Sequence, residues 1–266
     1  MKFAAIGDNC IDVYQNLGRG YPGGGPVNFA VRAARLGVST AYIGLIGEDA
    51  NGALLRYALL AEGVDISRLQ SISGATAVAY VRLEGTERVF VGKDRGVREK
   101  LVVDAQTDEF LKTFQLVHTT LDGCVDAHIP RWKEIGLRIS YDFSHRATPE
   151  QITLLPYIDY AFFSGQKHSW EDGPDLLRHY HSLGGQCVVM TFGQRGSIAF
   201  DGQNFIIQLA QPVEVIDTMG AGDAFQAGFV TTAMNGGTLE QALLMGTVSG
   251  AQACLESGGF GHGIDL

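Results

Sequence analysis

Near its carboxyl end the chain contains the segment Val213-Glu-Val-Ile-Asp217-Thr-Met-Gly220-Ala-Gly222-Asp223-Ala-Phe-Gln-Ala-Gly-Phe-Val230. The apolar residues at its start predict a strand, the small residues after Thr218 predict a tight turn, and the remainder predicts a helix. The backbone N–H groups of Gly220, Ala221 and Gly222 would point at whatever occupies the turn, where a helix start favours negative charge. The segment therefore predicts an anion site that suits a phosphate.

Asp223 falls in the first turn of this predicted helix, beside the anion site. A carboxylate there can be a simple helix cap, or it can accept a hydroxyl proton while the turn stabilises a transferring phosphoryl group. The segment has neither the G-x-x-x-x-G-K-[ST] pattern of a P-loop nor the G-x-G-x-x-G spacing of a dinucleotide site. Both interpretations of Asp223 stay open at this point.

The rest of the chain alternates apolar runs of strand length with segments of helical period. The predicted strands are 3–6, 40–46, 116–119, 138–143, 160–163 and 187–191, and the predicted helices are 27–36, 53–60, 175–183 and 239–256. Continuous apolar strands that alternate with helices predict a largely parallel sheet covered on both faces. The predicted fold class is therefore α/β.

One stretch departs from this alternation. Residues 75–83 and 86–91 are rich in β-branched and aromatic residues and flank the turn Glu84-Gly85, which predicts an antiparallel hairpin. Such a hairpin can extend a sheet, form an interface or cover a site, and we favour the last two. The chain has no fixed-period repeat and no low-complexity linker. We therefore expect one domain over residues 1–266, with a β lid formed mainly by about residues 75–92.

Composition argues against several classes of partner. The formal net charge of -9 disfavours a nucleic acid partner, because proteins that bind a phosphate backbone usually carry a basic excess. Asp8 and Asp12 interrupt the first apolar run before it resembles a signal peptide, and no later run reaches membrane-spanning length. The four cysteines are scattered without a C-x-x-C pair, which suggests neither a disulfide framework nor a zinc site. We expect a cytoplasmic protein with no nucleic acid or membrane partner.

The segment Asp217-Thr-Met-Gly-Ala-Gly-Asp223 resembles the D-T-x-G-A-G-D signature of ribokinase-like sugar kinases of the phosphofructokinase-B type. Residues 23–30 (Gly-Gly-Gly-Pro-Val-Asn-Phe-Ala) and 44–52 (Gly-Leu-Ile-Gly-Glu-Asp-Ala-Asn-Gly) are similar to two amino-terminal patterns of that family. The resemblance extends along nearly the whole chain. It implies a three-layer α/β/α sandwich with a largely parallel central sheet and a small β-hairpin lid, and an ATP-dependent kinase acting on a primary hydroxyl.

The resemblance also implies roles for particular residues. Asp223 would be the catalytic base, and the transferring phosphate would lie at Gly220, Ala221 and Gly222. The sugar substrate would be bound by Asp8, Asp12, Gly24, Gly25, Asn28, Arg88 and Phe90. Glycines let a polyol approach the backbone, and amide or carboxylate groups hold hydroxyls by paired hydrogen bonds. Taken singly, the glycines of 23–25 also fit a flexible loop before a helix, and Asp12 fits a solvated carboxylate.

The nucleotide is assigned by the same resemblance. The turn Thr191-Phe-Gly-Gln-Arg-Gly-Ser197 is similar to the family's T-x-G-x-x-G pattern, so ATP would contact Thr191, Gly193 and Gly196, with Ala251 and Cys254 in the adenine pocket. Alone, the turn fits any crossover and the two helix residues fit a packed face.

The metal assignment is weaker than the nucleotide assignment. Most family members carry N-x-x-E after a central strand, but this chain has Ser164-Gly-Gln-Lys167. We assign no metal ligand, and Mg²⁺ would be held mainly by ATP oxygens and water. A monovalent cation near Asp217, as in some relatives, is left open.

Within the family, residues 7–14, 87–90, 141–144 and 215–220 look most like the fructoselysine 6-kinase branch, which phosphorylates the 6-hydroxyl of fructosamine adducts of amino acids. That substrate carries both signs of charge, and the chain offers the mixed run Arg88, Lys93, Asp94, Arg95 and Arg98. An ordinary solvated surface is the other explanation of this run. A homodimer through the lid is also implied.

Two other functions stay open. The chain can be a kinase for another small sugar, such as fructose, 2-keto-3-deoxygluconate or ribose, or for a nucleoside. It can also be a non-catalytic sugar- or nucleotide-binding regulator, since the N-x-x-E carboxylate is missing. Asp223 argues against the regulator, because a protein that only binds has no chemical need for a base there.

Overall fold

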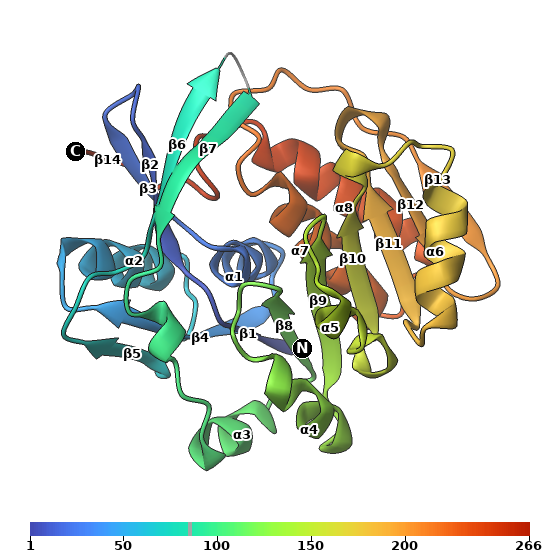
Figure 1. The fold of residues 1–266 in the computed structure, drawn as a ribbon, viewed down its shortest axis with the longest axis horizontal. Helices are drawn as coiled ribbons and strands as arrows, with labels where there is room; N and C mark the ends of the chain where they lie inside the picture. The colour runs from blue at the N-terminus through green and yellow to red at the C-terminus, as the bar shows by residue number, and fades with distance from the viewer. Residues whose placement is uncertain (85–86) are drawn as a thin grey trace.

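A computed structural model of the chain describes residues 1–84 and 87–266, and for residues 87 and 88 the backbone alone. Within these residues, nine strands form a central sheet in the order β13-β12-β11-β10-β9-β8-β1-β4-β5 (Figure 1). All neighbours pair in parallel except β12 and β13 at one edge, which pair antiparallel. The strands are β1 Lys2–Ile6, β4 Ser39–Gly47, β5 Leu69–Ile72, β8 Leu116–Thr120, β9 Arg138–Ser144, β10 Tyr160–Ser164, β11 Cys187–Thr191, β12 Ser197–Phe200 and β13 Phe205–Gln208.

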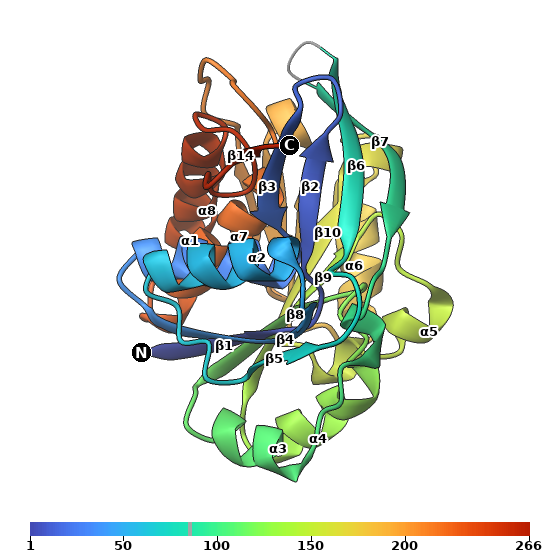
Figure 2. The ribbon, with the colours of Figure 1, turned by 90° about the vertical axis from the view of Figure 1, so that its left-hand side faces the viewer.

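Helices cover both faces of this sheet. One face carries α1 Gly25–Arg35, α2 Ala50–Ala61, α7 Ala221–Met234 and α8 Leu239–Ala253, and the other carries α3 Ala105–Leu111, α4 Ile129–Glu134, α5 Pro149–Ile152 and α6 Gly173–Ser182 (Figures 1 and 2). Successive strand residues point to opposite faces. In β1, Phe3 and Ala5 therefore join the core under α1 and α7, while Ala4 and Ile6 join the core over α4 and α6. The predicted three-layer α/β/α fold is confirmed.

A second sheet projects from this body in the order β14-β3-β2-β6-β7 (Figure 2). Its strands are β2 Cys10–Tyr14, β3 Arg19–Gly23, β6 Val78–Glu84, β7 Glu87–Asp94 and β14 Ile264–Asp265. The predicted hairpin is confirmed as β6 and β7, which pair antiparallel, and its turn at 85–86 lies outside the described residues. The other three strands were not predicted, since Asp12 interrupts β2 and two glycines and a proline weaken β3.

The strand predicted at the start of the glycine-rich segment is wrong. Residues 209–219 form no regular element. Pro212 has no N–H to give to a strand ladder, and the N–H of Ile216 donates instead to the Cys254 carbonyl at the end of α8, at 2.8 Å. The alternating apolar residues there belong to an irregular segment that is hydrogen-bonded to the end of α8.

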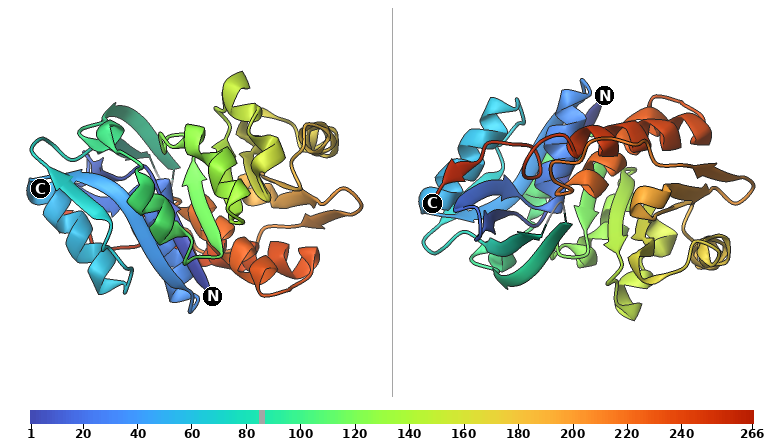
Figure 3. Two further views of the ribbon diagram at one scale, coloured as in Figure 1. Left: turned by 90° about the horizontal axis from the view of Figure 1, so that it is seen from below. Right: turned by 90° about the horizontal axis from the view of Figure 1, so that it is seen from above.

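The arrangement brings the carboxyl ends of the parallel strands close to the beginnings of α1 and α7. Seen from above, α7 and α8 lie between the second sheet and strands β12 and β13 (Figure 3). Ligands of open α/β sheets bind outside the carboxyl ends of the strands.

None of the helices in the described ranges is both long and apolar enough to cross a membrane.

Candidate active site

The glycine turn, residues 218–223, lies at the start of α7. Gly220 is the N-cap residue and has a φ of 72°, in the left-handed region that favours glycine. A Cβ atom built on Gly220 would lie 2.9 Å from the Cα of Gly259, whereas one built on Gly222 would meet nothing within 4 Å. Gly222 is exposed, so α7 begins at the surface, where the first N–H groups of a helix lack partners within the helix. The Ala221 N–H also makes a long hydrogen bond of 3.3 Å to Thr218.

Asp223 is half-buried in the first turn of α7, and its partner comes from α1. The Asn28 amide nitrogen donates to Asp223 Oδ2 at 2.7 Å. A Cβ atom on Gly25, the first residue of α1, would lie 3.5 Å from Asp223 Oδ1 and 2.7 Å from Thr120 Cγ2. Two helix N-termini thus meet at Asp223, and both favour negative charge there. The geometry suits an anion that reaches the glycine turn beside this carboxylate.

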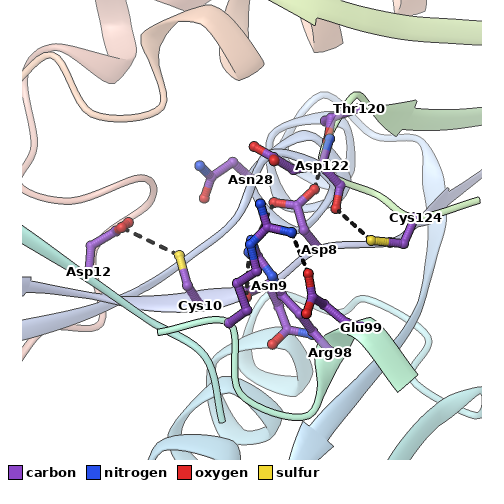
Figure 4. A network of polar contacts seen from close by, with 12 residues as sticks. Asp8, Asn9, Cys10, Asp12, Asn28, Arg98, Glu99, Thr120, Asp122 and Cys124 are labelled. Atoms are coloured by element: carbon purple, nitrogen blue, oxygen red, sulfur yellow. Dashed lines mark hydrogen bonds and ion pairs between the residues drawn. The ribbon is translucent and has the colours of Figure 1, made fainter. Parts of the chain in front are cut away.

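Asp8 follows β1 and is almost fully buried. The Thr120 hydroxyl donates to Asp8 Oδ1 at 2.6 Å, and Arg98 Nη1 lies 3.9 Å from Asp8 Oδ2 (Figure 4). Burial raises the pKa of Asp8 above its ordinary value, while the Thr120 hydrogen bond and the Arg98 charge oppose this rise. Asp8 is therefore a carboxylate whose charge depends on its neighbours.

Asp12 lies on β2, with 3% of its surface exposed. The Cys10 thiol donates to Asp12 Oδ1 at 3.4 Å (Figure 4). Any side chain on Gly23 would collide with the Asp12 carboxylate, and a Cβ on Gly24 would lie 2.6 Å from the Cα of Asn9. The glycines before α1 therefore let the chain pass close to both carboxylate-bearing strands. Of the predicted sugar-binding residues, Gly25 and Asn28 lie beside Asp223, Gly24 lies against Asp8 and Asn9, and Asp12 lies against Gly23 on the second sheet.

Phe90 and Arg88 lie on β7 of the second sheet. Phe90 pairs with Val81, and Val81 is the neighbour of Tyr14 on β2. Paired residues share a face of a sheet, so Phe90 lies on the face that carries Tyr14 and also Asp12. The Phe90 side chain is 59% exposed. The side chain of Arg88 lies outside the described residues.

Several residues of this region were not predicted. Asp122 follows β8, and its Oδ2 accepts a hydrogen bond from Arg146 Nη2 at 2.6 Å. Burial alone would raise the pKa of Asp122, but the hydrogen bond and charge of Arg146, with Lys93 and Arg98, hold it below its usual value. Thr120 was missed as well. Its position at the carboxyl end of a predicted strand was the signal that could have pointed to it.

A further carboxylate, Asp142, lies near the carboxyl end of β9 and pairs with Thr120, the last residue of β8. Burial raises the pKa of Asp142, and hydrogen bonds from Gln226 of α7 and from the Ser144 N–H oppose the rise. Gln226 lies one helical turn after Asp223. Asp142 therefore adds negative charge at the same edge of the sheet.

The predicted nucleotide turn connects β11 to β12. Gly193 has a φ of 57° and Gly196 a φ of 110°, and a Cβ on Gly196 would lie 2.8 Å from the Cα of Leu209. Thr191 ends β11 next to Ser164 of β10. A pocket of about 600 Å³ beside this turn is lined by Trp170, Glu171, Gln194, Arg195, Ile207, Leu209 and Ala210. The lining of this pocket combines apolar side chains with the charged Glu171 and Arg195.

Ala251 and Cys254 lie at the end of α8 and are half-buried. The Cys254 carbonyl accepts hydrogen bonds from the N–H groups of Ile216 and Asp217, just before the glycine turn. Helix α8 also packs against β12 and β13. The end of α8 therefore lies between the glycine turn and the strands that follow the nucleotide turn.

Metal binding would depend on the nucleotide. Within residues 1–84 and 87–266, no group of three or more His, Cys, Asp or Glu side chains is arranged to hold a metal ion. Ser164 caps the short 3₁₀ turn Gly165–Lys167, accepting from the Gln166 N–H at 3.4 Å. The residues present fit a Mg²⁺ ion held mainly by nucleotide oxygens and water, near the carboxylates of this edge.

Comparison with known proteins identifies the family of the chain. The profile described as "pfkB family carbohydrate kinase" matches residues 8–130 and 158–261. The chain is 36% identical over 250 residues to fructoselysine 6-kinase of Escherichia coli (strain K12), which covers 94% of this chain and 95% of that protein. It is 34% identical over 268 residues to a fructosamine kinase of Bacillus subtilis (strain 168), covering 99% and 94%.

Solved structures share the fold. An E. coli protein described as a ribokinase II, in complex with ATP and Mg²⁺, superposes with a TM-score of 0.82 at 23% identity, over 97% of this chain and 94% of that one. Arabidopsis thaliana ribokinase, complexed with ribose and ATP, gives a TM-score of 0.81 at 22% identity, over 97% and 93%. The chain therefore belongs to the pfkB family of carbohydrate kinases, and is an ATP-dependent sugar kinase.

Proposed function

We propose that this chain transfers the γ-phosphoryl group of ATP to the 6-hydroxyl of fructoselysine or a related fructosamine amino acid. The contact between Asn28 and Asp223 at the glycine turn carries the kinase part of the proposal. Two relatives, a fructoselysine 6-kinase and a fructosamine kinase, support the substrate by their names. Other small sugars remain outcomes of the test below.

In the proposed reaction, Asp223 accepts the proton of the attacking hydroxyl. Asn28 donates to Asp223 Oδ2, and Oδ1 lies on the side of Gly25, where the sugar hydroxyl would approach. The N–H groups at the start of α7 would stabilise charge on the transferring phosphoryl group. Bound Mg²⁺ would neutralise charge on the phosphates. A loose phosphoryl-transfer transition state needs little early proton removal, so correct positioning of Asp223 matters more than its basicity.

The sugar would lie between the two helix N-termini and the second sheet. Asp8 and Asp12 would accept hydrogen bonds from its hydroxyls, and the absence of side chains at Gly24 and Gly25 makes room for it. Phe90, on the same face of the second sheet as Asp12, would cover it. The second sheet then acts as a lid that excludes water and limits ATP hydrolysis.

The amino acid end of a fructosamine needs partners of both charges. Asp122 and Arg146 form an ion pair next to Asp8, and Lys93 and Arg98 are close enough to act on Asp122 electrostatically. The substrate ammonium would meet Asp122, and its carboxylate would meet Arg146 or Lys93. A plain ketohexose has no groups for these side chains, which is why we favour the fructosamine.

The nucleotide would extend from the glycine turn to the turn between β11 and β12. Its phosphates would lie at Gly220–Gly222 and Gly196, and its adenine would lie near Ala251 and Cys254 of α8. The carbonyl of Cys254 links α8 to the segment before the glycine turn, so adenine binding and phosphate placement would be coupled.

We extend the proposal to the organisation of the protein. Residues 1–266 would act as one domain with the second sheet as its lid, and two copies would pair through that sheet. Strand β7 is an edge strand, and its Val89 and Val91 are 38% and 44% exposed. Sedimentation of the wild type as a dimer, and of Val89→Lys as a monomer, would support pairing through the second sheet. A monomeric wild type would refute it.

The scattered cysteines and the use of ATP fit a cytoplasmic location.

The decisive experiment measures steady-state ADP release from MgATP with fructoselysine, other fructosamine amino acids, fructose, ribose and 2-keto-3-deoxygluconate. We expect the highest kcat/KM with fructoselysine, and a loss of about 10²–10⁴-fold in kcat for Asp223→Asn, the usual contribution of a general base. Preference for a plain sugar would overturn the fructosamine assignment. Near-normal turnover by a folded Asp223→Asn enzyme would overturn the role of Asp223.

A further inference from the structure

The carboxylate of Asp217 is buried immediately before the glycine turn, with 1% of the residue exposed. Three donors reach it. The Tyr14 hydroxyl donates to Oδ2 at 2.5 Å, the Gly258 N–H donates to the same oxygen at 2.9 Å, and the Met219 N–H donates to Oδ1 at 2.9 Å. Hydrogen bonds to a carboxylate are short and strong when both groups are buried.

The three donors come from three separate parts of the chain. Tyr14 ends β2 of the second sheet, two residues after Asp12. Met219 belongs to the glycine turn itself. Gly258 belongs to the loop after α8, whose next residue, Gly259, packs against Gly220. Asp217 thus joins the strand that carries a sugar-binding carboxylate to the turn that would hold the phosphates.

A monovalent cation at this carboxylate does not fit the contacts. A buried carboxylate needs an opposite charge or several hydrogen bonds. Among the ion pairs of the described residues, none includes Asp217. Its two oxygens are instead satisfied by three donors, and a cation placed there would face the donor hydrogens of Tyr14 and Gly258.

We infer that the Tyr14 hydroxyl replaces such a cation. The hydroxyl holds the Asp217 carboxylate in place, and Asp217 in turn fixes the position of the glycine turn through its hydrogen bond with the Met219 N–H. Tyr14 is then a positioning residue for the nucleotide phosphates. Two consequences follow. Nucleotide binding needs no K⁺, and loss of the single hydroxyl weakens nucleotide binding although the Tyr14 ring does not touch the nucleotide.

The test removes only that hydroxyl. Tyr14→Phe keeps the ring, which packs edge-on against Tyr21 with ring centroids 5.2 Å apart. MgADP affinity is measured by calorimetry, and kcat and KM for ATP by ADP release, each in KCl and in choline chloride at equal ionic strength. For wild type we expect equal values in the two salts, within twofold. For Tyr14→Phe we expect MgADP affinity and kcat/KM for ATP to fall by about 10–100-fold, the loss expected for a hydrogen bond to a charged group.

Tyr21→Phe is the matched control, because Tyr21 belongs to the same buried cluster and is 5% exposed. We expect it to keep wild-type affinity. Stimulation of the wild type by KCl of more than threefold would overturn the inference, and this measurement needs no variant to fold. Wild-type MgADP affinity in Tyr14→Phe, or an equal loss in Tyr21→Phe, would overturn it too.

The inference rests on the proposed placement of the phosphates at the glycine turn. A further variant distinguishes an error in the role of Tyr14 from an error in that placement. Gly220→Ala disturbs the turn directly. If Gly220→Ala lowers MgADP affinity and Tyr14→Phe does not, only the role of Tyr14 is wrong. If neither does, the phosphates bind elsewhere and the proposed site fails as well. MgADP binding needs no sugar, so an error in the sugar assignment cannot affect this result.

Discussion

The glycine turn at 218–223 and the carboxylate cluster of Asp8, Asp12 and Asp122 are built differently. The turn is one contiguous stretch that presents backbone N–H groups, and its shape depends on Gly220. The cluster draws side chains from the ends of β1 and β8 and from β2, and its charges depend on Thr120, Arg98 and Arg146. We therefore expect substitutions in the turn to lower activity by changing its backbone shape, and substitutions in the cluster to lower activity by changing the charge of its side chains.

Among the substitutions that distinguish the shape of the turn from the charge of the cluster, the largest effect is expected at Gly220. Alanine there would be strained at a φ of 72° and would press on Gly259, so Gly220→Ala should cost about 1–3 kcal/mol of stability and lower Tm by several degrees. Turnover should fall by at least about 10-fold, because a displaced donor no longer stabilises the transferring group. Thermal melts and ADP release measure the two losses.

Gly222→Ala is the matched control for shape. Its Cβ meets nothing within 4 Å, and alanine favours a helix, so stability should be kept or rise by up to about 1 kcal/mol. The methyl group would occupy space next to the proposed phosphates, so KM for ATP should rise. An unchanged KM for ATP would argue that the phosphates lie elsewhere.

At the cluster, we expect Arg146→Ala to raise KM for fructoselysine by about 10-fold, since a charge-assisted hydrogen bond contributes about 1.5–3 kcal/mol. The kcat/KM for fructose should change by less than about twofold, because fructose has no carboxylate for Arg146. Kinetics with both sugars check this. Equal losses of kcat/KM with both sugars would mean that Arg146 maintains the structure of the cluster and does not bind the amino acid end of the substrate.

A smaller effect should appear in the pH profile of Thr120→Val. The Thr120 hydroxyl opposes the rise in the pKa of Asp8, so its removal raises that pKa further. Ionised Asp8 is the form that accepts sugar hydrogen bonds. The kcat/KM for sugar therefore falls as pH drops through this pKa, and in Thr120→Val the fall should begin at a higher pH than in the wild type. An unmoved acidic limb would exclude Asp8 as its source.

The smallest effect is expected for Arg95. Its guanidinium pairs with Glu99 on the surface, with the two side chains 48% and 45% exposed. Exposed pairs contribute about 0–1 kcal/mol. Arg95→Ala should therefore change stability by less than about 1 kcal/mol and every kinetic constant by less than about twofold. A larger change in KM for fructoselysine alone would bring Arg95 into the amino acid site.

The same comparison explains how far the sequence could predict this site. The glycine turn is contiguous, so its helix start, its anion preference and the place of Asp223 followed from local pattern. Asp8 and Asp12 were placed at the substrate only by family resemblance. Their neighbours Thr120 and Arg146 were missed, because they come together only through the order of strands in the sheet.

Sequence pattern also failed where context overrides local preference. The apolar alternation at 213–216 predicted a strand, but within the described residues this segment pairs with no strand, and the Ile216 N–H donates to the Cys254 carbonyl after α8. Strand β3 was missed because Pro22 and its two glycines are unfavourable in a strand, although pairing with β2 and β14 holds it in place. In both cases the conformation of the segment depends on the helix or strand to which it is hydrogen-bonded, and not on its own sequence.

The hydrogen bond between Asn28 and Asp223 spans 195 residues of chain, and that between Tyr14 and Asp217 spans 203. Contacts between such distant segments form late, because a long loop must close before they can be made. During synthesis the first 200 residues leave the ribosome without the glycine turn or its carboxylate. In the proposed mechanism a partly made chain therefore lacks both the catalytic base and the phosphate site, which are completed only when residues 217–223 reach Tyr14 and Asn28.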